Sequence, residues 1–233
     1  MADFPYRHGL IVGAGMGISG ALTRQLTKRG VKVALAARDT EKLRPLVDET
    51  GALAFTADAS KSSAVEALFA RVDDELGTPD LVIYNASSRV PGPLASVDSA
   101  LVGQSLAVTA FGAFLVAQQA AKRMEPKGRG AILFTGATAG IKGFAQSASF
   151  AMGKFALRGL AQSAARELGP KGIHVVHFNI DGAVRSARRP DLAHEPDATL
   201  DPEAIGQNYI DVLAQPRNAW TQEIDLRPWT ERF

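Results

Sequence analysis

Short apolar runs alternate along this chain with longer stretches in which apolar residues recur at helical spacing. The runs are rich in Val, Ile, Leu and Phe without polar alternation, which is typical of strands buried on both faces of a sheet. Helices are expected between them, the longest at about 97–125 and 148–168. The pattern predicts an α/β fold, a single domain over 1–233 with a doubly wound, Rossmann-type parallel sheet and helices on both faces. Its strands are expected at 9–12, 32–37, 52–57, 80–86, 131–136 and 173–180.

Two local features refine this pattern. Ser60 precedes the third helical stretch and is a candidate N-cap for it. The segment 181–202 is rich in Arg, Pro, Asp and His and has no clear period. Because long loops in compact domains are often functional, we predict a substrate-site lid there.

Composition narrows the class of protein. Apolar residues make up 46% of the 233 residues, enough for a substantial core, and the net charge of +2 gives no field that favours nucleic acid or a membrane surface. The chain has no cysteine, which excludes disulfides and thiolate chemistry. It shows no signal-peptide pattern at its start and no uninterrupted apolar run of 18 residues. We therefore expect a cytoplasmic protein without nucleic acid or membrane as partner.

The first predicted strand runs directly into the glycine-rich segment VGAGMGISG. Gly13, Gly15, Gly17 and Gly20 lie where the strand turns into a helix. Glycines at such a turn let the backbone approach a pyrophosphate, and the helix N-terminus offers free N–H groups to it. The alternative is a turn that holds no ligand, but placement on the first strand of a βαβ series favours a dinucleotide site.

The end of the second strand, AARD, bears on which dinucleotide binds. An acid at this point reads the ribose 2′-hydroxyl of NAD, whereas an arginine pairs with the 2′-phosphate of NADP. Ala37 holds the acid position and Arg38 follows, while Asp39 is expected to belong to the next helix. This favours NADP(H) over NAD(H). The alternative is that Arg38 is an exposed surface residue.

With these motifs, the chain resembles a short-chain dehydrogenase/reductase over about residues 8–186. VGAGMGIS resembles the family's TGxxxGxG loop, with Val12 and Ser19 as departures, YNAS resembles its NNAG, and DGAVRS resembles its PGxxxT. The resemblance implies that the nucleotide is bound by Gly13, Gly15, Met16, Gly17, Ile18, Arg38, Asp58, Ala59, Asn85, Ala86, Ser87, Lys154, Asp181 and Gly182.

The family's catalytic Asn, Ser, Tyr and Lys correspond by spacing to Thr109, Ala137, Phe150 and Lys154, the last two in SFAMGK. In the family the tyrosine is the general acid/base and the serine orients the substrate carbonyl. The lysine lowers the tyrosine pKa and binds the nicotinamide ribose. A phenyl ring exchanges no proton, and a positioned acid/base contributes roughly 10²–10⁴-fold in rate. Only Lys154 keeps its family identity, with an exposed helix lysine as the alternative.

Two functions remain open. One is an NADP(H)-dependent oxidoreductase with an atypical site, because family members such as the dienoyl-CoA reductases work without the tyrosine. The other is a catalytically inactive NADP-binding sensor or scaffold. Substitute donors for the first, each with capping or core packing as its alternative, are Tyr84, Ser87, Ser88, Thr109, Thr135 and Thr138.

Several further residues carry weaker expectations. His174 and His177 fall on opposite faces of a buried strand, so they are expected to be structural and no metal is predicted. Arginines at 185, 188 and 189 suit an anionic substrate, with cofactor phosphates or plain solvation as alternatives. Trp220 and Trp229 are expected to cover a subunit contact or the mouth of the pocket. The resemblance implies a homodimer or homotetramer formed through the two long helices.

Overall fold

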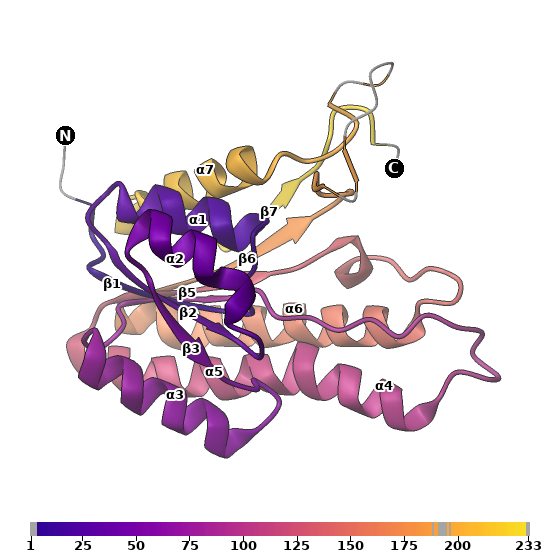
Figure 1. The fold of residues 1–233 in the computed structure, drawn as a ribbon, viewed down its shortest axis with the longest axis horizontal. Helices are drawn as coiled ribbons and strands as arrows, with labels where there is room; N and C mark the ends of the chain where they lie inside the picture. Colours follow the sequence, from indigo (N-terminus) through magenta and orange to yellow (C-terminus); the bar gives the residue numbers. More distant parts are fainter. Residues whose placement is uncertain (1–3, 188, 191–194, 196, 232–233) are drawn as a thin grey trace.

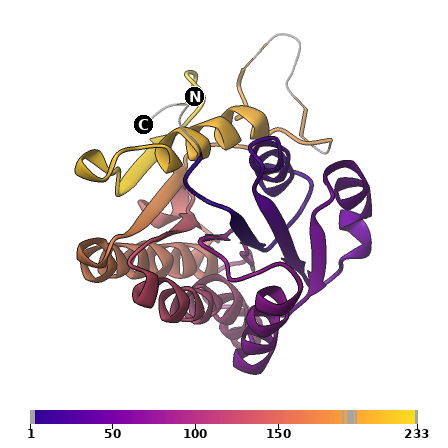
Figure 2. The ribbon, with the colours of Figure 1, turned by 90° about the vertical axis from the view of Figure 1, so that its left-hand side faces the viewer.

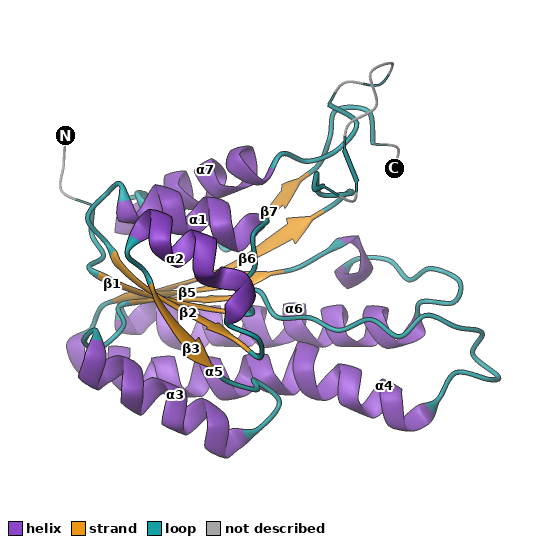
Figure 3. Cartoon of the chain, viewed as in Figure 1, coloured by secondary structure: helices purple, strands orange, loops and turns teal. Residues whose placement is uncertain are grey.

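The computed structural model describes residues 4–187, 189–190, 195 and 197–231, which form one parallel sheet between two helical layers (Figures 1 and 3). Six strands confirm the predicted ones to within one or two residues at each end. The seven strands lie in the order β3-β2-β1-β4-β5-β6-β7. They are β1 (His8–Val12), β2 (Lys32–Ala37), β3 (Leu53–Thr56), β4 (Leu81–Tyr84), β5 (Gly130–Thr135), β6 (Ile173–Ile180) and β7 (Glu223–Leu226).

Helices cover both faces of the sheet, as predicted (Figure 2). One layer contains α1 (Ile18–Thr27), α2 (Arg44–Thr50) and α7 (Pro202–Leu213). The other contains α3 (Ser62–Glu75), α5 (Gly112–Met124) and α6 (Ala148–Leu168).

Each layer encloses its own apolar core. In β1, Leu10 and Val12 enter one core and Ile11 enters the other, because successive side chains in a strand point to opposite faces. Every residue of β4 and β5 is buried, which explains why these strands show no polar alternation.

The predicted helix at 97–125 is confirmed, although it is not uniform. α4 (Ser99–Leu106) passes through η2 (Ala107–Phe111), a π-helical turn, into α5. The continuous segment Ser99–Lys127 is long and apolar enough, by length and composition alone, to cross a membrane. A core helix of a globular protein meets the same criteria, and α5 packs its buried side chains against the sheet.

Three features differ from the sequence prediction. Ser60 is not the N-cap of α3, because the helix begins two residues later and the Ser60 hydroxyl instead donates to Asp58 Oδ1 at 2.7 Å. Helix α7 and strand β7 were not predicted. Asp201 caps α7 by accepting a hydrogen bond from the Glu203 amide at 3.1 Å.

Part of the predicted lid at 181–202, including Arg188, lies outside the described residues. Within its described part, Val184 and Leu200 form an isolated bridge, and the last two lid positions already belong to the start of α7.

Candidate functional site

A cleft of about 320 Å³ opens at the carboxyl ends of β1, β2 and β4. Strand order reverses between β1 and β4, and such a switch point is where doubly wound sheets bind their ligands. The cleft brings together the predicted glycine turn and the predicted second, third and fourth strand ends. Its walls contain Val12, Gly13, Ala14, Ala36, Ala37, Arg38, Asp39, Ala57, Asp58, Ala59, Asn85, Ala86, Ser87 and Val108.

The glycine turn has the geometry that a bound pyrophosphate requires. Gly13 has φ of 83°, and a Cβ there would lie 2.3 Å from the Ala86 backbone nitrogen. At Gly15 and Gly17 a Cβ would meet nothing within 4 Å, so this stretch of backbone is open to a ligand. Met16 between them is exposed, and Ile18 is the first residue of α1. The turn therefore fits a dinucleotide phosphate at a helix N-terminus.

Ser19, which departs from the family's glycine-loop pattern, contacts the residue that follows β4. The Asn85 side-chain amide donates to Ser19 Oγ at 2.8 Å and to the Gly13 carbonyl oxygen at 3.4 Å. The Asn85 backbone amide donates to the Val12 carbonyl oxygen at 2.8 Å. Ser19 thus helps to fix the two loops that face each other across the cleft.

Arg38 and Asp39 follow β2, and Asp39 lies two residues before η1 (Glu41–Leu43) rather than within that helical turn. Arg38 and Asp39 both line the cleft, but Asp39 pairs with Lys42 at 2.8 Å. This hydrogen bond lowers the pKa of the Asp39 carboxyl. Asp58 accepts from the Ser60 hydroxyl and backbone amide, which lowers the pKa of its carboxyl too.

Lys154 lies outside this cleft, among the positions that the family resemblance assigns to catalysis. It is 3% exposed, so the alternative of an exposed helix lysine is wrong. Its ammonium group donates to the Thr135 carbonyl oxygen at the end of β5, at 2.7 Å. Burial lowers the pKa of this ammonium group from 10.5 to about 8. Asp181 and Gly182 follow the end of the adjacent strand β6.

The other three positions that the resemblance assigns to catalysis lie around the start of α6. Phe150 is in its first turn, and the Lys154 ammonium nitrogen lies 5.8 Å from the centre of its ring. Thr109 contacts α6 at Gly153, where a Cβ would come within 3.0 Å of the Thr109 side chain. Ala137 immediately precedes η4 (Thr138–Gly140), which packs against the same helix.

Most of the candidate substitute hydroxyls are already engaged. Tyr84 is fully buried and donates to the Val108 carbonyl oxygen. Thr135 shares a hydrogen bond of 2.9 Å with Tyr209 of α7. Thr109 accepts from the Ser88 backbone amide at 2.9 Å. Within the described part of the chain, no contact singles out Ser87, Ser88 or Thr138 as a replacement proton donor.

One residue beside Phe150 was missed by the sequence analysis. The guanidinium carbon of Arg89 lies 5.6 Å from the centre of the Phe150 ring. Arg89 is an exposed residue in the loop after β4. No motif marks it, because the contact depends on how this loop returns across α6.

Both histidines are buried in β6, and the contacts of His174 fit the expected structural role. His174 stacks on Trp220 with ring centres 4.5 Å apart, and its Nε2 lies 2.8 Å from the Thr221 carbonyl oxygen. His177 is buried, which lowers the pKa of its imidazole to about 4. Because His174 is near the amino end of β6, Trp220 lies at the amino-terminal end of the strands, opposite the cleft. Trp220 therefore does not cover the mouth of this cleft, and its other predicted role, in a subunit contact, stays a prediction. Trp229 is exposed.

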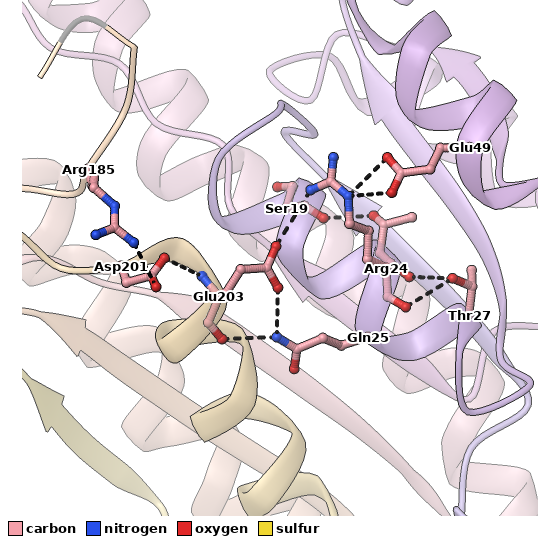
Figure 4. A network of polar contacts seen from close by, with 9 residues as sticks. Ser19, Arg24, Gln25, Thr27, Glu49, Arg185, Asp201 and Glu203 are labelled. Carbon is pink, nitrogen blue, oxygen red and sulfur yellow. Dashed lines mark hydrogen bonds and ion pairs between the residues drawn. The ribbon is translucent and has the colours of Figure 1, made fainter. Parts of the chain in front are cut away.

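Polar contacts connect the lid region to the helix that follows the glycine turn (Figure 4). Arg185 pairs with Asp201 at 2.7 Å, at the start of α7. Gln25 of α1 donates to the Glu203 carbonyl and carboxylate oxygens, and Arg24 bridges Glu203 and Glu49. Arg185 is thus held by a carboxylate, which weakens its assignment to an anionic substrate.

Together the glycine turn, the switch-point cleft and the buried lysine define a dinucleotide-binding α/β protein. Residues 7–194 match the short chain dehydrogenase family. A short-chain dehydrogenase/reductase of Hericium erinaceus is 33% identical over 174 residues, which cover 70% of this chain and 69% of that protein. The chain belongs to the short-chain dehydrogenase family and is an oxidoreductase of that type.

Other relatives and solved structures agree. L-2,3-butanediol dehydrogenase of Corynebacterium glutamicum is 28% identical over 212 residues, covering 86% of this chain and 80% of the enzyme. A short-chain dehydrogenase structure from Rhodopseudomonas palustris is 31% identical, with a TM-score of 0.81 over 96% of this chain and 99% of that one. A metagenomic short-chain oxidoreductase in complex with NADP is 28% identical, with a TM-score of 0.82 over 95% of this chain and 97% of that one.

Proposed function

We propose that this protein is an NADP(H)-dependent oxidoreductase that acts on a small-molecule substrate through an atypical active site. The observation that carries the cofactor preference is the pair of residues after β2. Arg38 lines the cleft, while the carboxylate beside it, Asp39, is held by Lys42. An arginine at this position, with the adjacent acid engaged by Lys42, favours a 2′-phosphate over a free 2′-hydroxyl. The related oxidoreductase with bound NADP supports the same preference.

The residues present fit the cofactor. The open backbone at Gly15 and Gly17 would hold the pyrophosphate, Asp58 and Ala59 the adenine side, and Lys154 the nicotinamide ribose. When bound, the nicotinamide supplies hydride chemistry. The protein's own contribution is to orient the substrate and hold its charge, because Phe150 and Ala137 offer no donor to a developing oxyanion.

The cofactor proposal is tested by fluorescence titration of the wild type and of Arg38→Gln with NADPH and NADH. We expect the wild type to bind NADPH more tightly, and the variant to lose roughly 10- to 100-fold for NADPH alone, the worth of one charge-assisted hydrogen bond. Arg29→Gln, an exposed arginine beyond the far end of α1, is the matched control. Tighter NADH binding by the wild type would refute the preference.

Turnover is tested separately, by NADPH oxidation with ketones, quinones and enoyl thioesters as acceptors. Turnover with any of them supports the enzyme. NADPH binding without turnover across all three classes would instead favour the sensor or scaffold, which follows from the loss of the tyrosine and serine.

We also propose that the protein is cytoplasmic and forms a homodimer or homotetramer through α5 and α6. Leu101, Phe111 and Phe114 on the α4–α5 segment are exposed, as are Met152 and Phe155 on α6. Exposed apolar side chains gathered on neighbouring helices mark a contact surface, and a second copy is the occupant that the family resemblance favours.

A further inference from the structure

Arg89 is held against the catalytic face of α6 by the loop that carries it. The neighbouring Ser88 carbonyl oxygen accepts from the Ser105 hydroxyl at 2.9 Å, and the Ser88 amide donates to Thr109. On the other side, the Ser149 hydroxyl donates to the Val90 carbonyl oxygen at 2.9 Å. The backbone is thus fixed on both sides of Arg89. The guanidinium lies near the Phe150 ring on a fixed stretch of loop, although the side chain itself is exposed.

The surroundings of Phe150 carry uncompensated positive charge. Arg89 and Lys154 both lie within 6 Å of the ring centre. The first turn of α6 contains no acidic residue, and the N-terminus of a helix is itself partly positive. Among the described residues, neither cation has a carboxylate partner; Lys154 donates only to a backbone carbonyl. Such a place favours an anion.

Exposed apolar side chains lie on the loop before α6. The loop of Arg89 and the loop before α6 are joined by the Gly92 amide, which donates to the Gln146 carbonyl oxygen at 3.0 Å. Ile141 and Phe144 on the second loop are exposed. A guanidinium binds a carboxylate through two parallel hydrogen bonds. The combination of one accessible guanidinium, a phenyl ring and apolar loop residues suits a small organic acid with an apolar body.

We propose that Arg89 binds a carboxylate of the substrate beside Phe150, so that the protein acts on organic acids. The inference rests on the proposed function, since it assigns the substrate of that same site. It also transfers the anionic-substrate role from Arg185, which Asp201 already neutralises, to a residue that faces the catalytic positions. The charge of Arg89 then holds the substrate in place, where the family's tyrosine would exchange a proton.

The test is isothermal titration of the NADPH-saturated protein with benzoate and with benzamide, a neutral molecule of the same shape. Arg89→Met removes the charge while keeping much of the length, and Arg89→Lys keeps the charge but not the paired geometry. Arg29→Met is the control for the loss of one exposed arginine elsewhere. The same titrations without nucleotide separate this inference from the cofactor proposal, because they measure benzoate binding whether or not NADPH binds.

We expect the wild type and the control to bind benzoate at least tenfold more tightly than benzamide. Arg89→Met should weaken benzoate binding by roughly 10- to 100-fold, the worth of a charge-assisted pair, without changing benzamide or NADPH binding. Arg89→Lys should lie between them. Equal binding of benzoate and benzamide by the wild type, or an equal loss of both in Arg89→Met, would overturn the inference even if NADPH binds as proposed.

Discussion

Replacing Lys154 with methionine tests how much the buried ammonium group costs the fold. Burial lowers the pKa of this group from 10.5 to about 8. At about 1.4 kcal/mol for each tenfold change in proton affinity, keeping it charged in the folded protein at pH 7 costs on the order of 3 kcal/mol. The hydrogen bond to the Thr135 carbonyl oxygen is lost in the variant, and an unsatisfied buried carbonyl costs about 1–3 kcal/mol. We therefore expect Lys154→Met to be as stable as the wild type at pH 7, or more stable by about 2 kcal/mol.

The pH dependence gives the sharper signal. Between pH 8 and 10.5 the unfolded chain holds a proton at Lys154 that the folded protein has released, so the stability of the wild type rises with pH through this window. Methionine exchanges no proton. From pH 7 to 9.5 the wild type should therefore gain about 2 kcal/mol of unfolding free energy relative to the variant. Buried tyrosines with raised pKa values, such as Tyr6, are present in both proteins and cancel in the difference.

The assay is urea unfolding of both proteins at several pH values from 7 to 9.5, at constant ionic strength. Lys127→Met, at an exposed position, controls for the loss of one positive charge and should follow the wild type. A wild-type-to-Lys154→Met difference that stays constant across this range would refute the reasoning. NADPH affinity measured on the same proteins should fall by roughly 10- to 100-fold in Lys154→Met if the ammonium group binds the ribose.

Three other predictions follow from the site and its surroundings. Gly13→Ala forces a left-handed residue against the Ala86 backbone and should lower the free energy of unfolding in urea by about 2–5 kcal/mol. Gly15→Ala should leave the free energy of unfolding unchanged and weaken NADPH binding. Equal stability of the two variants would contradict this prediction. Phe150→Tyr combined with Ala137→Ser should raise NADPH-dependent ketone reduction by roughly 10²–10⁴-fold, and no gain would mean that the missing donors do not limit the reaction. A charge placed on the exposed apolar surface by Phe114→Asp should lower the molar mass found by light scattering, and an unchanged mass would remove α5 from the subunit contact.

The sheet could be predicted because its central strands are buried on both faces. Continuous apolar runs such as those of β4 and β5 identify strands without any knowledge of their neighbours. The last strand, β7, is short and only partly buried at the sheet edge, so its four residues carry no such run. Helix α7 was missed although its start is readable, with Asp201 as N-cap and Pro202 in the first turn.

The walls of the cleft were predictable where a residue directly follows its own strand. Gly13, Arg38 and Asn85 follow β1, β2 and β4. Because these strands are parallel, all three residues lie at the same carboxyl-terminal end of the sheet. Arg89 was not predictable in this way. Its position depends on the hydroxyls of Thr109 and Ser149, which hold the loop from two different helical segments. Sequence spacing does not show which loop such hydroxyls will bind.

The energetics of Lys154 bear on cofactor binding, whereas those of Arg89 bear on the choice between an enzyme and a sensor. A buried ammonium group that has no carboxylate partner among the described residues destabilises the free protein, and a bound ribose hydroxyl would offset part of that cost in an enzyme and a sensor alike. Lys154 therefore supports cofactor binding and gives no information on turnover. Arg89 is exposed, so its charge is inexpensive to keep, and it does not line the cleft at the glycine turn. Under our proposal a second ligand beside Phe150 uses this charge, and benzoate binding that depends on Arg89 would favour a substrate site over one that holds nucleotide alone.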